Sequence, residues 1–229
     1  LQQRLMAMVG HDLRTPLSGI TWNAALLVRS GLPHAEADLV RRISASAKRM
    51  ERLIRDVLDY GRVHAGAGIP IAPEPGDLAV ICREVVEQSH DAAHPVSLAA
   101  NGETTGTWDA DRVEQVVANL VANAVKYGPA GRPVSVRLHG EPDAVRIEVH
   151  DEGGGIPPTV RSRLFEPWRC GDGVEGKGSV GLGLFIVRTL AEAHGGTVSV
   201  DSDAERGTTF TVRLPRRVSA VRRSAAVAG

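Results

Sequence analysis

The stretch DADRVEQVVANLVANAVKYG, residues 109–128, decides the fold of the second half of the chain. Its apolar residues recur every three or four positions, which predicts an amphipathic helix that runs from an acidic cap to a stop at Gly128. Asn119 and Asn123 lie one turn apart on this helix, and Lys126 follows one turn later. Two amides and an ammonium on one face can serve Mg²⁺ and phosphates, although alone they are more typical of an ordinary polar face.

The segments around this helix predict a mixed α/β domain over residues 76–215, because helical and strand-like patterns follow one another. One further helix is capped near Asp77. Two alternating segments joined by GEPD form a hairpin. The remaining helices are expected in 157–168 and 182–196, and the strands in 95–100, 133–140, 144–151 and a last hairpin over 197–215.

Two glycine-rich motifs follow predicted strands or precede predicted helices. In DEGGGIP, residues 151–157, Asp151 ends a strand, and the glycines after it let a ligand approach the backbone. The carboxylate can accept a hydrogen bond from an exocyclic amine. In GSVGLGL, residues 178–184, the glycines open a helix whose bare amides and positive end form a phosphate site. Either motif alone is more often a simple structural turn than a ligand site.

Residues 1–65 predict two long amphipathic helices, broken near Gly31 and Pro33. Such a helical hairpin buries too little apolar surface alone, so pairing with a second copy into a four-helix bundle is the natural way to cover it. The apolar positions are Met6, Val9, Leu13, Leu17, Ile20, Ala24 and Leu27 in the first helix, and Leu39, Ile43, Met50, Leu53, Ile54, Val57 and Leu58 in the second.

A lone histidine, His11, lies two residues before Leu13 and so points about 200° away from the apolar stripe. Thr15 lies one turn further on the same face. Pro16 cannot donate a hydrogen bond to the carbonyl of Asp12, and it should bend the helix there. By itself this pattern indicates only a surface histidine near a kink.

The composition narrows the class of protein. Lys+Arg and Asp+Glu both number 27 in 229 residues, and the zero net charge argues against a dedicated nucleic-acid binder. The two cysteines, Cys82 and Cys170, have no metal or redox spacing. No apolar run approaches the roughly 18 residues of a membrane span. We therefore expect a cytoplasmic segment with no membrane contact of its own, and further N-terminal regions, such as a sensor or membrane anchor, are compatible with a chain that enters a helical pattern at once.

Taken together and in this order, the motifs closely resemble the core of a two-component sensor histidine kinase, with a HisKA domain and a Bergerat-fold ATPase domain. HDLRTPL resembles the phosphoacceptor box, NLVANAVKYG the N box, DEGGGIP and GSVGLGL the glycine boxes, and RLFEP the phenylalanine box. The resemblance implies an α+β fold in which an antiparallel helical hairpin forms a dimeric four-helix bundle, followed by an α/β sandwich of the Bergerat (GHKL) type. The expected domains are 1–65, a linker over 66–75, the ATP-binding domain over 76–215 and a flexible basic tail over 216–229.

The resemblance also implies catalytic roles. His11 would be phosphorylated, and Asp12 would orient its imidazole or help to deprotonate it, so that Nε2 is the nucleophile. Pro16 would let the helix flex between states. Thr15 would position water for removal of phosphate from the partner, unless its hydroxyl only bonds back to the helix. Asn123 would be the Mg²⁺ ligand, with Asn119 beside it positioning water or the γ-phosphate.

ATP would be held by residues of the three other motifs. Lys126 and Tyr127 would contact phosphate and nucleotide, and Asp151 would bind the adenine amine. Gly153 and Gly155, next to Ile156, would make room for the base. Gly181 and Gly183, next to Leu182 and Leu184, would make room for the phosphates. Residues 166–180 would form a lid over ATP, anchored by Phe165.

The departures from the family pattern are few. Trp168 stands where phenylalanine is usual, and Cys170 where arginine is frequent, with Arg169 one place earlier. These changes put a phosphate contact at the start of the lid in doubt and remove no catalytic group. The expected partners are a second copy of the chain and the receiver domain of a response regulator.

Two alternatives remain open from the sequence. One is another ATPase of this fold, such as a gyrase, mismatch-repair or chaperone ATPase or a serine-phosphorylating anti-sigma kinase, which the hairpin over 1–65 disfavours. The other is a dimeric scaffold that binds nucleotide without transfer, which the intact His11, Asn123 and Asp151 disfavour.

Overall fold

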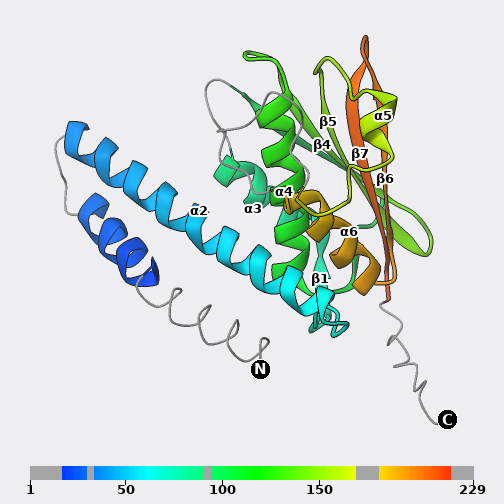
Figure 1. Ribbon diagram of the computed structural model, residues 1–229, viewed down its shortest axis with the longest axis horizontal. Coiled ribbons are helices and arrows are strands. Elements are labelled where there is room, and N and C mark those ends of the chain that lie inside the picture. Colours follow the sequence, from blue (N-terminus) through cyan, green and yellow to red (C-terminus); the bar gives the residue numbers. More distant parts are fainter. Residues whose placement is uncertain (1–16, 30–33, 90–93, 169–180, 218–229) are drawn as a thin grey trace. The chain divides into compact units, whose positions relative to one another are not determined.

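A computed structural model describes residues 17–29, 34–89, 94–168 and 181–217 (Figure 1). The chain divides into two compact units, residues 1–68 and 69–229. The predicted acceptor residues His11, Asp12 and Thr15, together with segment 169–180 of the predicted lid, lie outside the described residues. None of the helices in the described part is long and apolar enough to span a membrane.

The first unit contains the predicted helical hairpin. A helix over residues 17–29 lies alongside α2 (His34–His64) (Figure 1). On the inside of the hairpin the structure buries small and branched apolar side chains, namely Leu17, Ala24, Ala37, Val40 and Ala47. The breakers Gly31 and Pro33 fall between the two described helices, so the predicted division of this segment is confirmed.

A second set of apolar side chains in the hairpin is exposed. On α2 these residues recur at intervals of four and seven, which places them along one stripe of the helix. They are Leu39, Ile43, Met50 and Val57 on α2, and Ile20, Trp22, Leu26, Leu27 and Val28 on the preceding helix. The hairpin therefore buries only part of its apolar surface by itself.

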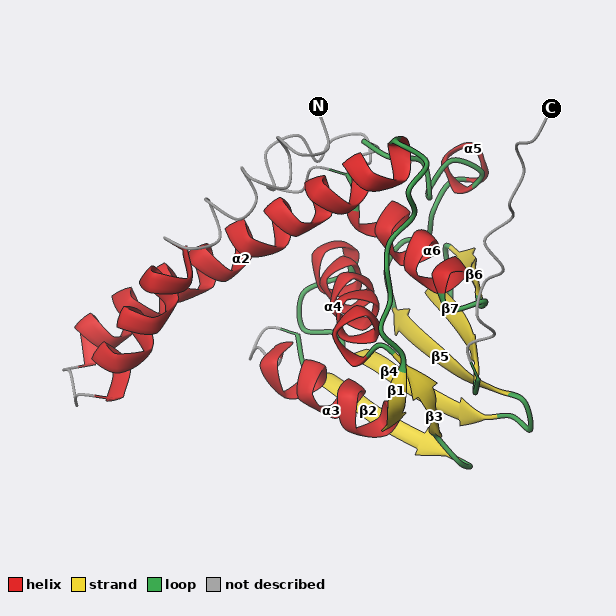
Figure 2. Cartoon of the chain, turned by 90° about the horizontal axis from the view of Figure 1, so that it is seen from below, coloured by secondary structure: helices red, strands yellow, loops and turns green. Residues whose placement is uncertain are grey.

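The second unit is built on a five-stranded mixed sheet in the order β2-β4-β5-β7-β6 (Figure 2). Strands β2 and β4 are parallel, and the other neighbours are antiparallel. The sheet strands are β2 (Val96–Asn101), β4 (Val134–Gly140), β5 (Ala144–Asp151), β6 (Thr197–Asp203) and β7 (Gly207–Pro215). The two predicted hairpins, β4-β5 and β6-β7, are thus confirmed.

Three helices cover one face of this sheet: α3 (Leu78–Ser89), α4 (Ala110–Tyr127) and α6 (Gly183–Ala193) (Figure 2). Successive side chains of a strand point to opposite faces of the sheet, so the apolar residues of a strand can share the face that the helices cover. The core between the helices and the sheet consists largely of branched aliphatic side chains. Leu120, Ile147 and Leu190 are fully buried there. The expectation of a helical hairpin followed by an α/β sandwich is confirmed.

Two details differ from the sequence predictions, namely a small second sheet that was not predicted and a helix over 157–168 that is shorter than predicted. Strands β1 (Glu74–Asp77) and β3 (Thr105–Trp108) form a separate two-stranded sheet. Their sequences, EPGD and TGTW, lack an alternating apolar pattern, so they give no strand signal. In the segment 157–168 only α5 (Pro158–Arg161) is helical, and turns follow it.

The segment after β7 remains attached to the second unit through Arg216. Its guanidinium donates hydrogen bonds to the main-chain oxygens of Glu103, Thr105 and Glu141. Its own carbonyl accepts from the N–H of Thr107. Arg216 thereby connects β3 to the β4-β5 hairpin.

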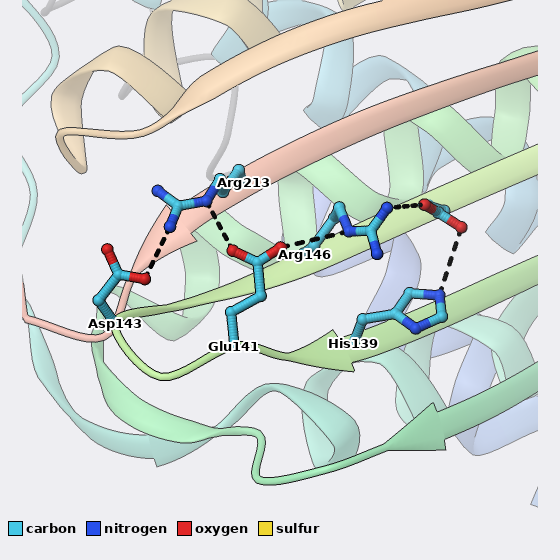
Figure 3. A network of polar contacts seen from close by, with 6 residues as sticks. His139, Glu141, Asp143, Arg146 and Arg213 are labelled. Atoms are coloured by element: carbon cyan, nitrogen blue, oxygen red, sulfur yellow. Dashed lines mark hydrogen bonds and ion pairs between the residues drawn. The ribbon is translucent and has the colours of Figure 1, made fainter.

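The outward face of the sheet carries a chain of ion pairs across three strands (Figure 3). Arg213 on β7 bonds to both Glu141 and Asp143 at 2.7 and 2.8 Å, and this arginine lowers the pKa of the Asp143 carboxyl. Arg146 connects Glu141 to Glu148, which lies 3.4 Å from His139. Exposure of these side chains ranges from 17% at Glu148 to 77% at Asp143, and the pairs that contact solvent contribute little stability.

Candidate functional site

Helix α4 presents the amide side chains of the site, and its cap fixes where it begins. Asp109 accepts a hydrogen bond from the N–H of Arg112 at 3.1 Å, as expected of an N-cap aspartate. The helix ends at Tyr127. A Cβ on Gly128 would lie 2.6 Å from the carbonyl oxygen of Ala124, so only glycine fits where the chain leaves the helix.

Asn119 connects α4 to the start of α6. Its Nδ2 lies 3.4 Å from the carbonyl oxygen of Gly183, the first residue of α6. Gly181, two residues earlier, has a φ of 74°, which favours glycine. One turn after Asn119, the half-buried Asn123 makes no hydrogen bond to any residue that the structure describes, so its amide is free for a ligand. Leu182 is buried beneath this corner, and Leu184 is half-buried.

Asp151 is the last inward-facing residue of β5, and the earlier inward-facing residues of this strand are apolar. Val145, Ile147 and Val149 alternate with polar residues and are buried, and Asp151 continues their series at 4% exposure. Its Oδ1 accepts a hydrogen bond from the N–H of Gly153 at 2.9 Å. A carboxylate therefore ends an apolar row on the helix-covered side of the sheet.

Burial raises the pKa of the Asp151 carboxyl, and the Gly153 hydrogen bond and nearby His150 only partly oppose that shift. Among the described residues, the N–H of Gly153 is the sole donor to this carboxylate. A buried carboxylate with a single donor gains from a further donor, which a ligand amine can supply.

The glycines after Asp151 are required by close backbone packing. A Cβ on Gly153 would lie 2.6 Å from Asp151 Oδ1 and 3.1 Å from the carbonyl oxygen of Tyr127. Gly155 has a φ of 76°, and a Cβ there would lie 2.9 Å from the main chain of Asp203. The loop thus runs closely between the end of α4 and the β6-β7 turn.

Three polar residues that the sequence analysis did not single out hold this loop. The hydroxyl of Ser202 accepts a hydrogen bond from the N–H of Ile156 at 2.8 Å and pairs with the hydroxyl of Thr208. Arg161 donates to the carbonyl oxygens of Ile156 and Ser202 at 3.1 and 2.6 Å. Thr208 also lies opposite Asp151 in the β5-β7 register. These residues carry no local motif, because the β6-β7 pairing joins Ser202 to Thr208 and Arg161 reaches Ser202 from α5, 41 residues earlier.

The aromatic residues of the site make separate contacts. Phe165 packs edge-on against Phe210 of β7, with ring centroids 6.5 Å apart. Lys126 lies 5.0 Å from the ring centroid of Tyr127, and that ring is exposed. Trp168, also exposed, has a φ of 63°, a strained value for a bulky side chain.

The second unit therefore brings together the amides of α4, the start of α6 and the carboxylate at the end of β5. On one side the Asp151 carboxylate can accept a further hydrogen bond. On the other side lie the main-chain N–H groups at the start of α6 and the side-chain amide of Asn123. This division suits a ligand with an amine-bearing base and a phosphate chain.

Comparisons with known proteins agree with this arrangement. Residues 1–66 match the family model described as "His Kinase A (phospho-acceptor) domain". Residues 108–218 match the model described as "Histidine kinase-, DNA gyrase B-, and HSP90-like ATPase".

The chain is also similar to curated proteins and solved structures. It is 38% identical over 222 residues to a bacteriophytochrome of Pseudomonas aeruginosa, covering 95% of this chain and 30% of the relative. It is 36% identical over 219 residues to the probable sensor histidine kinase TcrY of Mycobacterium tuberculosis, covering 93% of this chain and 46% of the relative. The crystal structure of full-length ShkA in complex with AMPPNP is 30% identical with a TM-score of 0.69, covering 94% of this chain and 46% of that one. The chain thus spans less than half the length of these relatives.

Proposed function

The chain belongs to the two-component sensor histidine kinases, and from this premise we propose that it binds ATP in its second unit and transfers the γ-phosphoryl group to His11. One observation carries the proposal. A unit with a buried carboxylate, a free amide and a glycine-led helix follows a helical hairpin that matches a phosphoacceptor domain. Other ATPases of this fold lack such a hairpin, and that disfavours them.

We assign the adenine amine to Asp151, because that carboxylate has a single protein donor and gains from a second. Phosphates would lie at the start of α6, where Gly181 and Gly183 leave backbone amides bare. Asn119 would position the γ-phosphate or water from beside Gly183. Lys126 and Tyr127 would contact phosphate and nucleotide, and Phe165 would anchor the base of a lid over 166–180.

Mg²⁺ would be held by the amide oxygen of Asn123 together with substrate phosphates and waters. The fit is supported by that amide having no hydrogen bond within the described residues. In that same part of the chain, no three His, Cys, Asp or Glu side chains gather as a metal site, so most ligands must come from substrate and water. When bound, Mg²⁺ neutralises charge on the phosphate chain.

The chemical step is an in-line displacement. Nε2 of His11 attacks the γ-phosphorus, the bond from that phosphorus to the bridging oxygen breaks, and ADP leaves with the electron pair. Asp12 would accept a hydrogen bond from Nδ1–H, which leaves the Nε2 lone pair free to attack. The phosphoryl group then passes to an aspartate of a response regulator: the carboxylate oxygen forms the new bond to phosphorus, and the bond from phosphorus to Nε2 breaks with its electron pair returning to the imidazole.

We further propose that the chain functions as a homodimer through the hairpin. The exposed apolar stripe on α2, Leu39, Ile43, Met50 and Val57, supports this, because soluble monomers rarely expose contiguous apolar patches of more than a few hundred Å². A second copy would cover the stripe by forming a four-helix bundle.

Incubation with γ-labelled ATP, Mg²⁺ and a panel of receiver domains tests the proposal. We expect a label that is stable to base and labile to acid, as a phosphohistidine is, and that passes to one receiver domain. An acid-stable label would contradict it. Nucleotide binding with no label at all would favour a dimeric nucleotide-binding scaffold, which is the remaining alternative.

A further inference from the structure

The helices α4 and α6 are joined at two points. Near the start of α6, Asn119 of α4 contacts the carbonyl of Gly183 at 3.4 Å. At the other end of α6, the main-chain N–H of Asp109, the cap of α4, donates to Nε2 of His194 at 3.2 Å. The helices pack on each other between these points and therefore run antiparallel over about 15 Å.

His194 is tied by both ring nitrogens. Its Nδ1 lies 2.8 Å from the carbonyl oxygen of Leu190, which can only accept, so Nδ1 carries the hydrogen. Nε2 must then accept, and the N–H of Asp109 is its donor. The ring is 1% exposed. A neutral imidazole thus supplies one donor and one acceptor at a place that water cannot reach.

The carboxylate of Asp109 brings in a third segment. While Oδ1 caps α4, Oδ2 accepts a hydrogen bond from the N–H of Ala72 at 2.8 Å. Ala72 lies in the stretch IPIAPEP, residues 69–75, whose three prolines make it stiff. We call the contacts among Ala72, Asp109 and His194 the cap joint.

We propose that Asp109 and His194 are positioning residues for the nucleotide site, and that they act by holding the register of α4 against α6. This inference rests on the proposed binding of ATP at Asn119 and the start of α6. The structural reason is that a helix is stiff along its axis, so a displacement of α4 at the cap joint also displaces Asn119.

The contact at the nucleotide end is sensitive to such a displacement. At 3.4 Å, the Asn119–Gly183 hydrogen bond is already longer than the usual N–H···O range of about 2.7–3.2 Å. A further shift of a few tenths of an ångström would break it. It would also move the start of α6 relative to Asn123, on which the proposed phosphate and Mg²⁺ contacts depend.

Substitutions at His194 test the inference on the full 229-residue chain. His194→Gln keeps a carbonyl oxygen that reaches the N–H of Asp109. His194→Asn is shorter and keeps only the donor toward Leu190. The measurement is the dissociation constant of a non-hydrolysable ATP analogue with Mg²⁺, by calorimetry. We expect binding about tenfold weaker for His194→Asn and near wild type for His194→Gln.

Thr104→Val is the matched control. Thr104 is buried and donates a hydrogen bond to Asp77 at 2.6 Å, just before α3, and among the described residues its side chain makes no hydrogen bond to α4 or α6. This variant should lower the melting temperature and leave the dissociation constant unchanged.

Equal affinity of His194→Asn and His194→Gln would overturn the inference. So would weakening by Thr104→Val as large as that by His194→Asn, because the effect would then be general destabilisation. If wild type itself does not bind the analogue, the proposed function fails first, and the two failures are therefore distinguishable.

Discussion

The hairpin and the ATP-binding unit differ in where their large apolar side chains lie. On α2, exposure of the apolar stripe ranges from 37% at Val57 to 57% at Leu39. In the second unit, Leu120, Ile147 and Leu190 are fully buried between the helices and the sheet. The second unit closes its core within one chain, whereas the hairpin leaves an apolar face for another copy. In the proposed function, the driving force for assembly lies in the unit that carries His11, and nucleotide binding lies in the other unit.

The largest expected effect is on assembly. Ile43→Lys puts a charge in the middle of the exposed stripe. We expect the dissociation constant of the dimer to rise about 100-fold or more, because burying an unpaired charge in an interface is costly. Sedimentation of wild type and variant across micromolar concentrations measures it. Ala45→Lys adds the same charge at an exposed position about 200° away and should remain dimeric. A wild-type chain that sediments as a monomer would refute the proposed assembly.

Asp151→Asn should affect only the other unit. The amide keeps an acceptor for Gly153 but replaces the charged acceptor that we assign to the adenine amine, so we expect ATP to bind about tenfold more weakly. Dimerisation should be unchanged. Calorimetric titration with nucleotide checks this, and unchanged affinity would move the adenine contact to another residue.

The same variant should show a pH-dependent difference in stability. Burial raises the pKa of Asp151 in the folded state, so the folded protein holds this proton at pH values where the unfolded chain has lost it. Wild type therefore loses stability relative to Asp151→Asn as pH rises from the unfolded pKa, about 3.9, through the higher folded value, and the difference then levels off. Thermal melts of both proteins across this range measure it. A difference that stays constant with pH would mean that the carboxylate is not strained by burial.

The smallest expected effect concerns Thr15. If its hydroxyl positions water against the acyl phosphate of a docked regulator, Thr15→Ala keeps autophosphorylation and transfer but slows loss of phosphate from the regulator. If the hydroxyl only bonds back to the helix, the variant changes stability by about 1 kcal/mol or less. The assay follows decay of a phosphorylated receiver domain with ADP and the kinase present. Decay at the wild-type rate would remove Thr15 from the phosphatase proposal.

The sequence was informative where a local pattern carries the structure. The N-cap Asp109, the inward alternation that ends at Asp151 and the helix start at Gly183 could all be found from spacing alone. The two strands β1 and β3 could not, because proline and glycine hide their pairing.

Contacts between residues far apart in the chain also could not be predicted from local sequence patterns. Ser202 and Thr208 meet through the β6-β7 pairing, Ser202 contacts Ile156 and Arg161 from more than 40 residues away, and His194 reaches Asp109 across 85 residues. A buried histidine at the end of an apolar helix gives no signal of what its ring nitrogens bind.

The central claim is that acceptor and nucleotide site belong to separate units, and His11→Ala tests it most directly. Wild type and variant are compared in two assays, labelling by γ-labelled ATP and the dissociation constant of a non-hydrolysable analogue with Mg²⁺. We predict that the variant loses all label and binds the analogue as tightly as wild type. Label that persists in His11→Ala, or nucleotide binding that disappears with it, would contradict the account.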